Sequence, residues 1–144
     1  MKRVSALLRQ EFGDVAFSTV YRTSPRDHRD QPDFLNAVAR VITKLTVEEV
    51  FEKTRGIESS LDKALPYPKG PRTIDIDLLL YGDLVSDDPK LKIPHPRLHE
   101  RRFVLEPLCE LIGAGERHPI LGMTYHELLA KNLDQVLAVT DIRL

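Results

Sequence analysis

The stretch "GPRTIDIDLLLYG", residues 70–82, decides how the fold and the function of this chain are interpreted. Two aspartates, Asp75 and Asp77, stand one residue apart in an apolar run that predicts a β-strand over 73–81. Side chains alternate between the two faces of a strand, so both carboxylates share one face and the apolar residues share the other. The Cα atoms of the two aspartates are then roughly 6.6 Å apart.

Two carboxylates at this spacing repel each other, and burying them unpaired costs several kcal/mol each. Magnesium removes the repulsion, because Mg²⁺ takes one or two carboxylates and leaves its other positions to water and phosphate. We therefore expect Asp75 and Asp77 to hold two Mg²⁺ ions that bridge phosphate groups. The alternative is that both lie on the solvent face of an amphipathic strand and pair with lysine or arginine.

Basic residues gather on both sides of the aspartates. Arg72 precedes them after a Gly-Pro turn, and the segment "KLKIPHPRLHERRF" follows, with Lys90, Lys92, His95, Arg97, His99, Arg101 and Arg102. Arginines at the start of a helix interact unfavourably with the helix dipole, so their position there suggests that they bind a ligand. Polyphosphate provides one, because paired acids hold the metal ions and converging cations hold the phosphates.

The composition is that of an ordinary globular domain, and we expect one domain over residues 1–144. Apolar residues make up 42% and charged residues 30% of the chain, and the formal net charge of −1 argues against a nucleic-acid surface. No apolar run approaches the ~20 residues of a membrane span. The single cysteine, Cys109, cannot form an internal disulfide, so we expect a cytoplasmic protein.

Hydrophobic periodicity predicts helices over 2–12, 46–63 and 99–112, and β-rich stretches predict strands over 15–24, 34–43 and 135–144. Capping boxes begin the second helix and a further short helix at Thr124. Hairpins interspersed with helices predict an α+β fold with a mainly antiparallel sheet and helices packed on it.

The same motifs resemble a known family. "GPRTIDIDLLLYG" followed by "IPHPRLHERRFVLEPL", together with "VYRTSP", "QPDFLNAV" and "HPILGMTYHELL", resembles the 6-hydroxymethyl-7,8-dihydropterin pyrophosphokinases of folate biosynthesis. The resemblance covers roughly residues 1–130. It implies a ferredoxin-like α/β sandwich that transfers pyrophosphate from ATP, the co-substrate, to the pterin hydroxymethyl oxygen, with two Mg²⁺ ions.

The resemblance also implies roles for individual residues. At the phosphates it places Arg72, Asp75, Asp77, His95 and Arg101, with the two aspartates as metal ligands. At the pterin it places Thr23, Ser24, Phe34, Asn36 and Phe103. On the nucleotide side it adds Glu58, Lys90 and Lys92 to Arg72, His95 and Arg101.

The sequence departs from the family at its start, where the family's first strand has no counterpart. Three explanations are a truncated start, a strand from a second chain, and a strand from residues 135–144 that fills the gap, and we rank truncation first. Within the matched region, Lys69 replaces a usual tryptophan and Pro96 replaces an aromatic residue.

Two other functions compete with a pyrophosphokinase. One is a non-catalytic or truncated relative that only binds nucleotide, pterin or another folate enzyme, but a pure binding module needs no acidic pair. The other is a D-x-D metal hydrolase, for which a further acidic cluster or a nucleophile is missing. We expect a monomer that binds small molecules, with strand exchange between two chains as the alternative.

Overall fold

Helices and antiparallel strands alternate along the part of the chain that the structure, a computed structural model, describes: residues 1–23, 34–63 and 74–144. This confirms the α+β class. Residues 25–33, which are polar and bounded by proline, and the proline-rich residues 64–71 lie outside these ranges; the sequence predicts loops for both. The elements are α1 (Lys2–Phe12), β1 (Val15–Phe17), β2 (Tyr21–Thr23), β3 (Phe34–Asn36), β4 (Ala39–Val41), α2 (Val47–Lys63), β5 (Ser86–Asp88), β6 (Leu91–Ile93), a 3₁₀ turn (Leu98–Glu100), α3 (Arg102–Leu111), α4 (Tyr125–Ala130) and β7 (Ala138–Val139).

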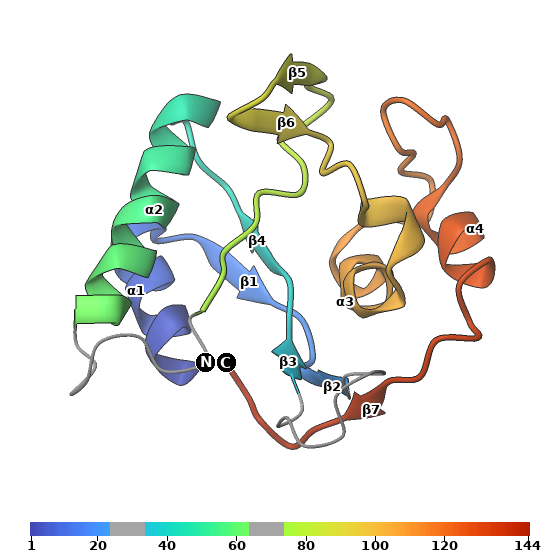
Figure 1. Ribbon diagram of the computed structural model, residues 1–144, viewed down its shortest axis with the longest axis horizontal. Coiled ribbons are helices and arrows are strands. Elements are labelled where there is room, and N and C mark those ends of the chain that lie inside the picture. Colours follow the sequence, from blue (N-terminus) through green and yellow to red (C-terminus); the bar gives the residue numbers. More distant parts are fainter. Residues whose placement is uncertain (24–33, 64–73) are drawn as a thin grey trace.

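A hairpin that bends in the middle forms the centre of the molecule (Figure 1). The strands predicted over 15–24 and 34–43 each divide in two, so that β1 pairs with β4 and β2 pairs with β3. The register shifts by one residue between the two halves, as a β-bulge requires. At the bend, the Ser18 hydroxyl accepts a hydrogen bond from the Val38 N–H at 2.9 Å, and this bond replaces one ladder bond.

The C-terminal strand is shorter than expected and lies beside β2. Only β7 forms within the predicted strand over 135–144, and it pairs with β2 in antiparallel orientation. The explanation that residues 135–144 fill a gap beside the aspartates is therefore wrong, because β7 extends the β3–β2 sheet instead.

The acidic segment, defined here as residues 74–81, follows an extended course past β4 (Figure 1). The strand predicted over 73–81 is wrong for these residues, because they form no ladder with any strand that the structure describes. One backbone bond ties the segment to the following loop, from the His95 N–H to the Leu79 carbonyl at 2.9 Å. A β-strand forms only when another strand lies about 4.8 Å away and pairs with it. The alternation of apolar and charged residues in the sequence does not show whether such a partner strand is present.

The helices form where the sequence predicts them, and local signals explain their ends. α1 ends at Gly13, whose φ of 79° suits glycine. α2 begins with a reciprocal pair of hydrogen bonds between Thr46 and Glu49, and a second capping box at Thr124 begins α4. Among the described helices, none combines the length and the apolar character that crossing a bilayer requires.

Two groups of apolar side chains hold the helices to the strands. Leu8 of α1 and the α2 residues Val47, Val50 and Ile57 are buried where these helices meet beside β1. On the other side of the hairpin, α3 and α4 share a core with the loop before them, formed by Val38, Leu98, Leu105, Leu108, Tyr125 and Leu128. The acidic segment therefore runs between two separately packed helix pairs (Figure 1).

Candidate functional site

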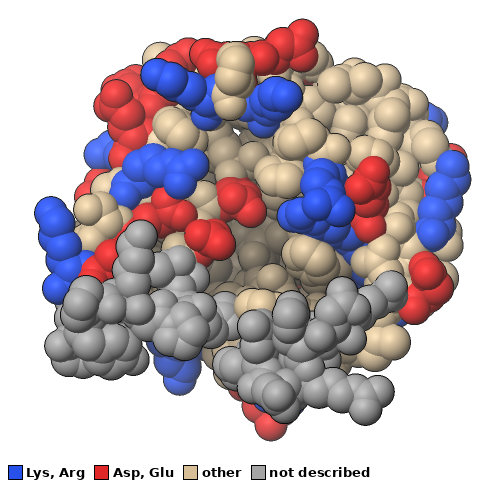
Figure 2. Space-filling view, viewed as in Figure 1, with Lys and Arg blue, Asp and Glu red and all other residues tan. Residues whose placement is uncertain are grey.

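A cleft of about 750 Å³ opens between β4 and the acidic segment. Apolar side chains of α1, α2 and α3 line its inner wall, while Asp75, Asp77 and Asp83 contribute carboxylates. Figure 2 shows this face hollowed near its middle, with acidic and basic side chains around the hollow. Charge of both signs at the edge of an apolar cleft suits a ligand with a flat ring and an ionic tail.

Asp75 and Asp77 lie exposed on the acidic segment, on either side of Ile76. The Ile76 N–H donates a hydrogen bond of 2.8 Å to Glu58 of α2, whose side chain is only 14% exposed. The other oxygen of Glu58 pairs with Arg55 at 2.9 Å. Without a ladder partner, the backbone between the two aspartates is thus held by a side chain of α2.

The donor chemistry of the two aspartates fits Mg²⁺. Neither carboxylate forms a hydrogen bond or an ion pair with any other residue that the structure describes. The described ranges also hold no group of three or more acidic, histidine or cysteine side chains that would suit a metal bound by protein alone. Two carboxylates without a partner among the described residues offer the oxygen ligands that Mg²⁺ takes, with its other positions left to water and substrate phosphate.

His95 faces the acidic segment from the loop after β6. Burial lowers its pKa below the usual value, the nearby Asp77 opposes this shift, and the guanidinium groups of Arg101 and Arg97 reinforce it. Its Nδ1 accepts a hydrogen bond from the Arg97 N–H at 3.2 Å, which leaves Nε2 to carry the proton of the neutral ring. His95 therefore lies within electrostatic range of Asp77, eighteen positions earlier in the chain, and of Arg101, six positions later.

Phe103 lies at the start of α3, beside Arg101. The Arg101 guanidinium is centred 5.5 Å from the middle of the Phe103 ring, within the range of a cation–π contact. The neighbouring α3 residues Leu105 and Leu108 are buried, whereas Phe103 is only half-buried. A side chain that served only as a core anchor would lie deeper, so the ring retains a face for a ligand.

Asn36 and Thr23 form a polar pair on neighbouring strands. The Asn36 amide donates a hydrogen bond of 3.1 Å to the Thr23 hydroxyl. This bond runs diagonally across the two strands, because Thr23 lies directly opposite Phe34 in the ladder. Phe34 is 38% exposed. Two further predicted site residues, Ser24 and Arg72, lie outside the described residues.

The expected nucleotide-side residues are less closely grouped. Lys92 lies on β6 opposite Asp87, and Lys90 lies in the adjoining turn, both with exposed side chains. Neither contributes to the lining of the cleft among the described residues. Glu58 is expected beside the nucleotide. In the structure one of its carboxylate oxygens accepts from the Ile76 N–H and the other pairs with Arg55.

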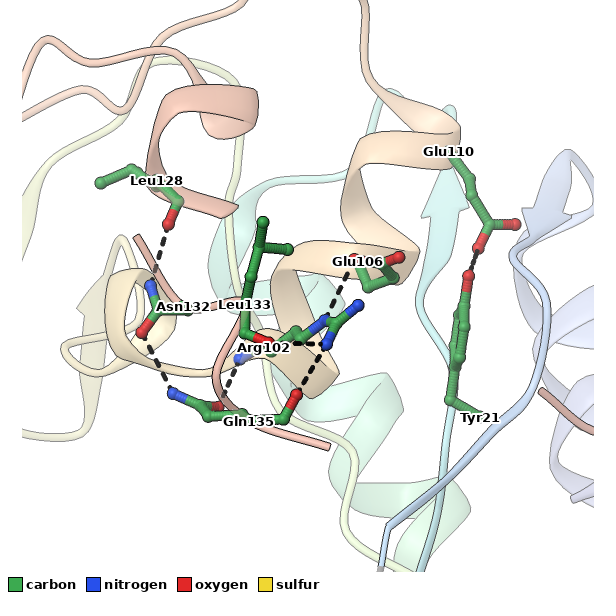
Figure 3. Close-up of polar contacts among 8 residues, drawn as sticks. All are labelled: Tyr21, Arg102, Glu106, Glu110, Leu128, Asn132, Leu133 and Gln135. Atoms are coloured by element: carbon green, nitrogen blue, oxygen red, sulfur yellow. Dashed lines mark hydrogen bonds and ion pairs between the residues drawn. The ribbon is translucent and has the colours of Figure 1, made fainter. Parts of the chain in front are cut away.

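Sequence reasoning missed two kinds of residue around the site. Asn132 and Gln135 bond to the carbonyls of His99 and Glu100, just before Arg101. Glu110 bonds to Tyr21 at 2.6 Å (Figure 3) and also accepts from Thr19. No sequence signal marks them, because each bond joins residues more than thirty positions apart. Burial and the bond to Glu110 raise the pKa of Tyr21, so its hydroxyl stays protonated as the donor.

His118 and Cys109 belong to the core rather than to the site. His118 is 5% exposed, and its Nδ1 accepts hydrogen bonds from Ile120 and Leu121 in a tight turn. Burial lowers its pKa, and His99 reinforces the shift. Cys109 is half-buried and packs against the α3–α4 core.

The fold and the site together define an α+β protein with a mixed acidic and basic cleft. The sequence profile of the 7,8-dihydro-6-hydroxymethylpterin-pyrophosphokinase family matches residues 1–113, and the chain belongs to this family. The family resemblance seen in the sequence is thereby confirmed.

Three relatives illustrate the range of proteins that the chain resembles. The "Folic acid synthesis protein fol1" of Pneumocystis carinii is 38% identical over 81% of this chain, and the "Folate synthesis bifunctional protein, mitochondrial" of Arabidopsis thaliana is 43% identical over 68%. The match covers only 16% and 18% of those two proteins. The "2-amino-4-hydroxy-6-hydroxymethyldihydropteridine pyrophosphokinase" of Bacillus subtilis is 35% identical over 88% of this chain and 77% of its own length.

Proposed function

We propose that this chain is a cytoplasmic, Mg²⁺-dependent pyrophosphokinase that acts on ATP and 6-hydroxymethyl-7,8-dihydropterin. The observation that carries the proposal is that His95 lies within electrostatic range of both Asp77 and Arg101, in a chain that belongs to the pyrophosphokinase family. A carboxylate pair with converging cations has the composition that polyphosphate transfer requires. The names of the relatives from Pneumocystis and Arabidopsis support folate synthesis as the setting, and the name of the Bacillus relative supports the pyrophosphokinase activity.

In the proposed reaction the pterin hydroxymethyl oxygen attacks the β-phosphorus of ATP. A new bond forms between this oxygen and the β-phosphorus, and the bond from the β-phosphorus to the oxygen of the α-phosphate breaks. AMP leaves with that electron pair, and the hydroxyl proton passes to solvent. The products are AMP and the pterin diphosphate.

Asp75 and Asp77 would hold magnesium, which supplies charge neutralisation at the phosphates when bound. Arg72, His95 and Arg101 bind phosphate oxygens, and the cations Lys90 and Lys92 approach from the nucleotide side. Burial lowers the pKa of His95, which favours the neutral ring, and a neutral ring can donate to phosphate from Nε2.

The pterin ring would be held by an aromatic face and by polar edges. Phe103 stacks on the ring, and the pair formed by Asn36 and Thr23 reads its hydrogen-bonding edge. Phe34 and Ser24 complete this proposed pocket. A flat heterocycle that must be told apart from similar rings needs both kinds of contact.

The experiment is a test for AMP with the purified chain, ATP, Mg²⁺ and 6-hydroxymethyl-7,8-dihydropterin, against a control without pterin. We expect AMP only when pterin and Mg²⁺ are both present. ADP as the product would indicate transfer of a single phosphate and contradict the proposal. A folded chain that binds ATP and pterin without forming AMP would favour the non-catalytic relative.

A further inference from the structure

The backbone that carries Arg101 is held from outside by side chains of the C-terminal part of the chain (Figure 3). We call residues 98–102 the Arg101 turn. The Asn132 amide donates to the His99 carbonyl at 3.0 Å, and the Gln135 amide donates to the Glu100 carbonyl at 2.8 Å.

Gln135 also caps α3. The N-cap residue, Arg101, makes no side-chain cap bond, and the first helical N–H, that of Arg102, donates instead to Gln135 Oε1 at 2.8 Å. The first N–H groups of a helix have no partner within the helix, so an acceptor from elsewhere fixes where the helix begins. Through its two amide atoms Gln135 therefore holds the backbone on both sides of Arg101.

Further bonds make this arrangement stiff. The Arg102 guanidinium donates to the carbonyls of Leu133 and Gln135 at 3.1 and 2.7 Å, and it pairs with Glu106 of α3 at 3.5 Å. Asn132 is itself held, because its amide donates to the Leu128 carbonyl at 2.9 Å and its oxygen accepts from Gln135 at 3.1 Å. Figure 3 shows these bonds linking α4, the chain after it and the start of α3.

The side chain of Arg101 is held less firmly than its backbone. It forms no ion pair with any other residue that the structure describes, and its guanidinium makes a cation–π contact with the Phe103 ring. The direction in which its guanidinium points therefore depends on the backbone. A displacement of about 1 Å in a group that orients a substrate can cost on the order of 100-fold in rate.

We propose that Asn132 and Gln135 are positioning residues that hold the Arg101 turn so that Arg101 meets the transferred phosphates. This inference rests on the proposed function. The two residues lie beyond residues 1–113, which the family profile matches, so the profile alone does not reveal them.

The test is a double-mutant cycle between Gln135→Met and Arg101→Ala, with kcat and both KM values measured at saturating Mg²⁺. Methionine keeps the length of glutamine but lacks both amide contacts. We expect Gln135→Met to lower kcat roughly tenfold or more, with the KM for pterin nearly unchanged. In the Arg101→Ala background the same change should have little further effect, because the group that it positions is already absent.

Asn132→Leu provides a second variant if Gln135→Met does not fold. It removes the bonds to the His99 and Leu128 carbonyls and the acceptor for the Gln135 amide, but leaves both groups with which Gln135 bonds to the Arg101 turn. Asp134→Asn is the matched control, because Asp134 is exposed between the two residues and should leave kcat unchanged. Gln135→Glu keeps the acceptor for the Arg102 N–H and should restore part of the lost rate.

The inference would be overturned if the double variant lost kcat by the product of the two single-variant losses. Gln135 would then act on the fold and not through Arg101. A Gln135→Met enzyme with the wild-type kcat would overturn it as well. Both results require an active wild-type chain. An inactive wild-type chain would instead overturn the proposed function together with this inference, so the two failures are distinguishable.

Discussion

Glu58 of α2 accepts a hydrogen bond of 2.8 Å from the backbone N–H of Ile76, the residue that separates Asp75 from Asp77. The acidic segment has no ladder partner among the described strands, so this bond is a main restraint on the spacing of the two carboxylates. The position of a proposed metal site is thus coupled to a helix that carries no metal ligand.

Replacing Glu58 should therefore weaken metal binding without touching a carboxylate ligand. We expect Glu58→Met to lower the affinity for Mn²⁺, measured by calorimetry or electron paramagnetic resonance, by roughly 10-fold or more. Glu58→Gln keeps an acceptor for the Ile76 N–H and should retain most of the affinity. Glu52→Met, at an exposed position of α2, is the control, and an equal loss there would argue against a specific role for Glu58.

Asp75→Asn and Asp77→Asn should each reduce Mg²⁺-dependent turnover by roughly 100-fold or more, because each removes a carboxylate that would hold the Mg²⁺ that neutralises the phosphates. Both side chains are exposed and have no described partner, so the thermal unfolding temperature should stay the same or rise slightly. AMP assays and thermal unfolding check the two expectations. Turnover that survives either change would contradict a two-metal site.

Phe103→Ala should weaken pterin binding far more than ATP binding, because the ring supplies a stacking face for the pterin. Loss of an aromatic contact of this kind costs roughly 1 kcal/mol or more. Calorimetric titration with each substrate measures the two effects. Phe103→Leu distinguishes packing from stacking: if leucine restores pterin affinity fully, Phe103 is an ordinary apolar contact.

Stability should fall as the pH drops below about 6.5, the pKa of an unperturbed histidine. Burial lowers the pKa of His118 and of His95 in the folded protein, so the unfolded chain takes up these protons first and folding becomes less favourable. The capping carboxylates Glu49 and Glu127 also have lowered pKa values, but stability from them is lost only at more acidic pH. Urea unfolding at pH 7.5 and 5.5 measures the difference.

His118→Asn should reduce this pH dependence, because an asparagine oxygen can accept from the Ile120 and Leu121 N–H groups without titrating near pH 6. His126→Asn is the control, since His126 is exposed. If both variants keep the full pH dependence of the wild type, another group is responsible.

Local signals in the sequence predict the helices well. The capping boxes at Thr46 and Thr124 and the terminal Gly13 act within a few residues, and the structure has each of them where expected. The bulge between β1 and β2 escapes such reasoning, because it depends on the bond from Val38 to Ser18 twenty residues away. The strand predicted over 73–81 fails for the same reason, since pairing is a property of two segments.

The candidate site, like the fold, has some residues that the sequence marks and others that only distant contacts place. Residue types and spacing single out Asp75 and Asp77, and the family resemblance adds His95 and Arg101. In the structure His95 lies within electrostatic range of Asp77 and Arg101. The supporting residues Glu58 and Gln135 act through backbone groups that carry no sequence signature. Only the three-dimensional arrangement shows which distant side chains hold the reactive groups in place.

The central claim is the transfer of an intact pyrophosphate group, and ³¹P NMR of a single reaction mixture tests it most directly. With the wild-type chain, ATP, Mg²⁺ and 6-hydroxymethyl-7,8-dihydropterin, we predict equal amounts of AMP and a pterin product that carries two coupled phosphorus atoms. A pterin monophosphate with ADP, or free phosphate without any pterin ester, would contradict the account.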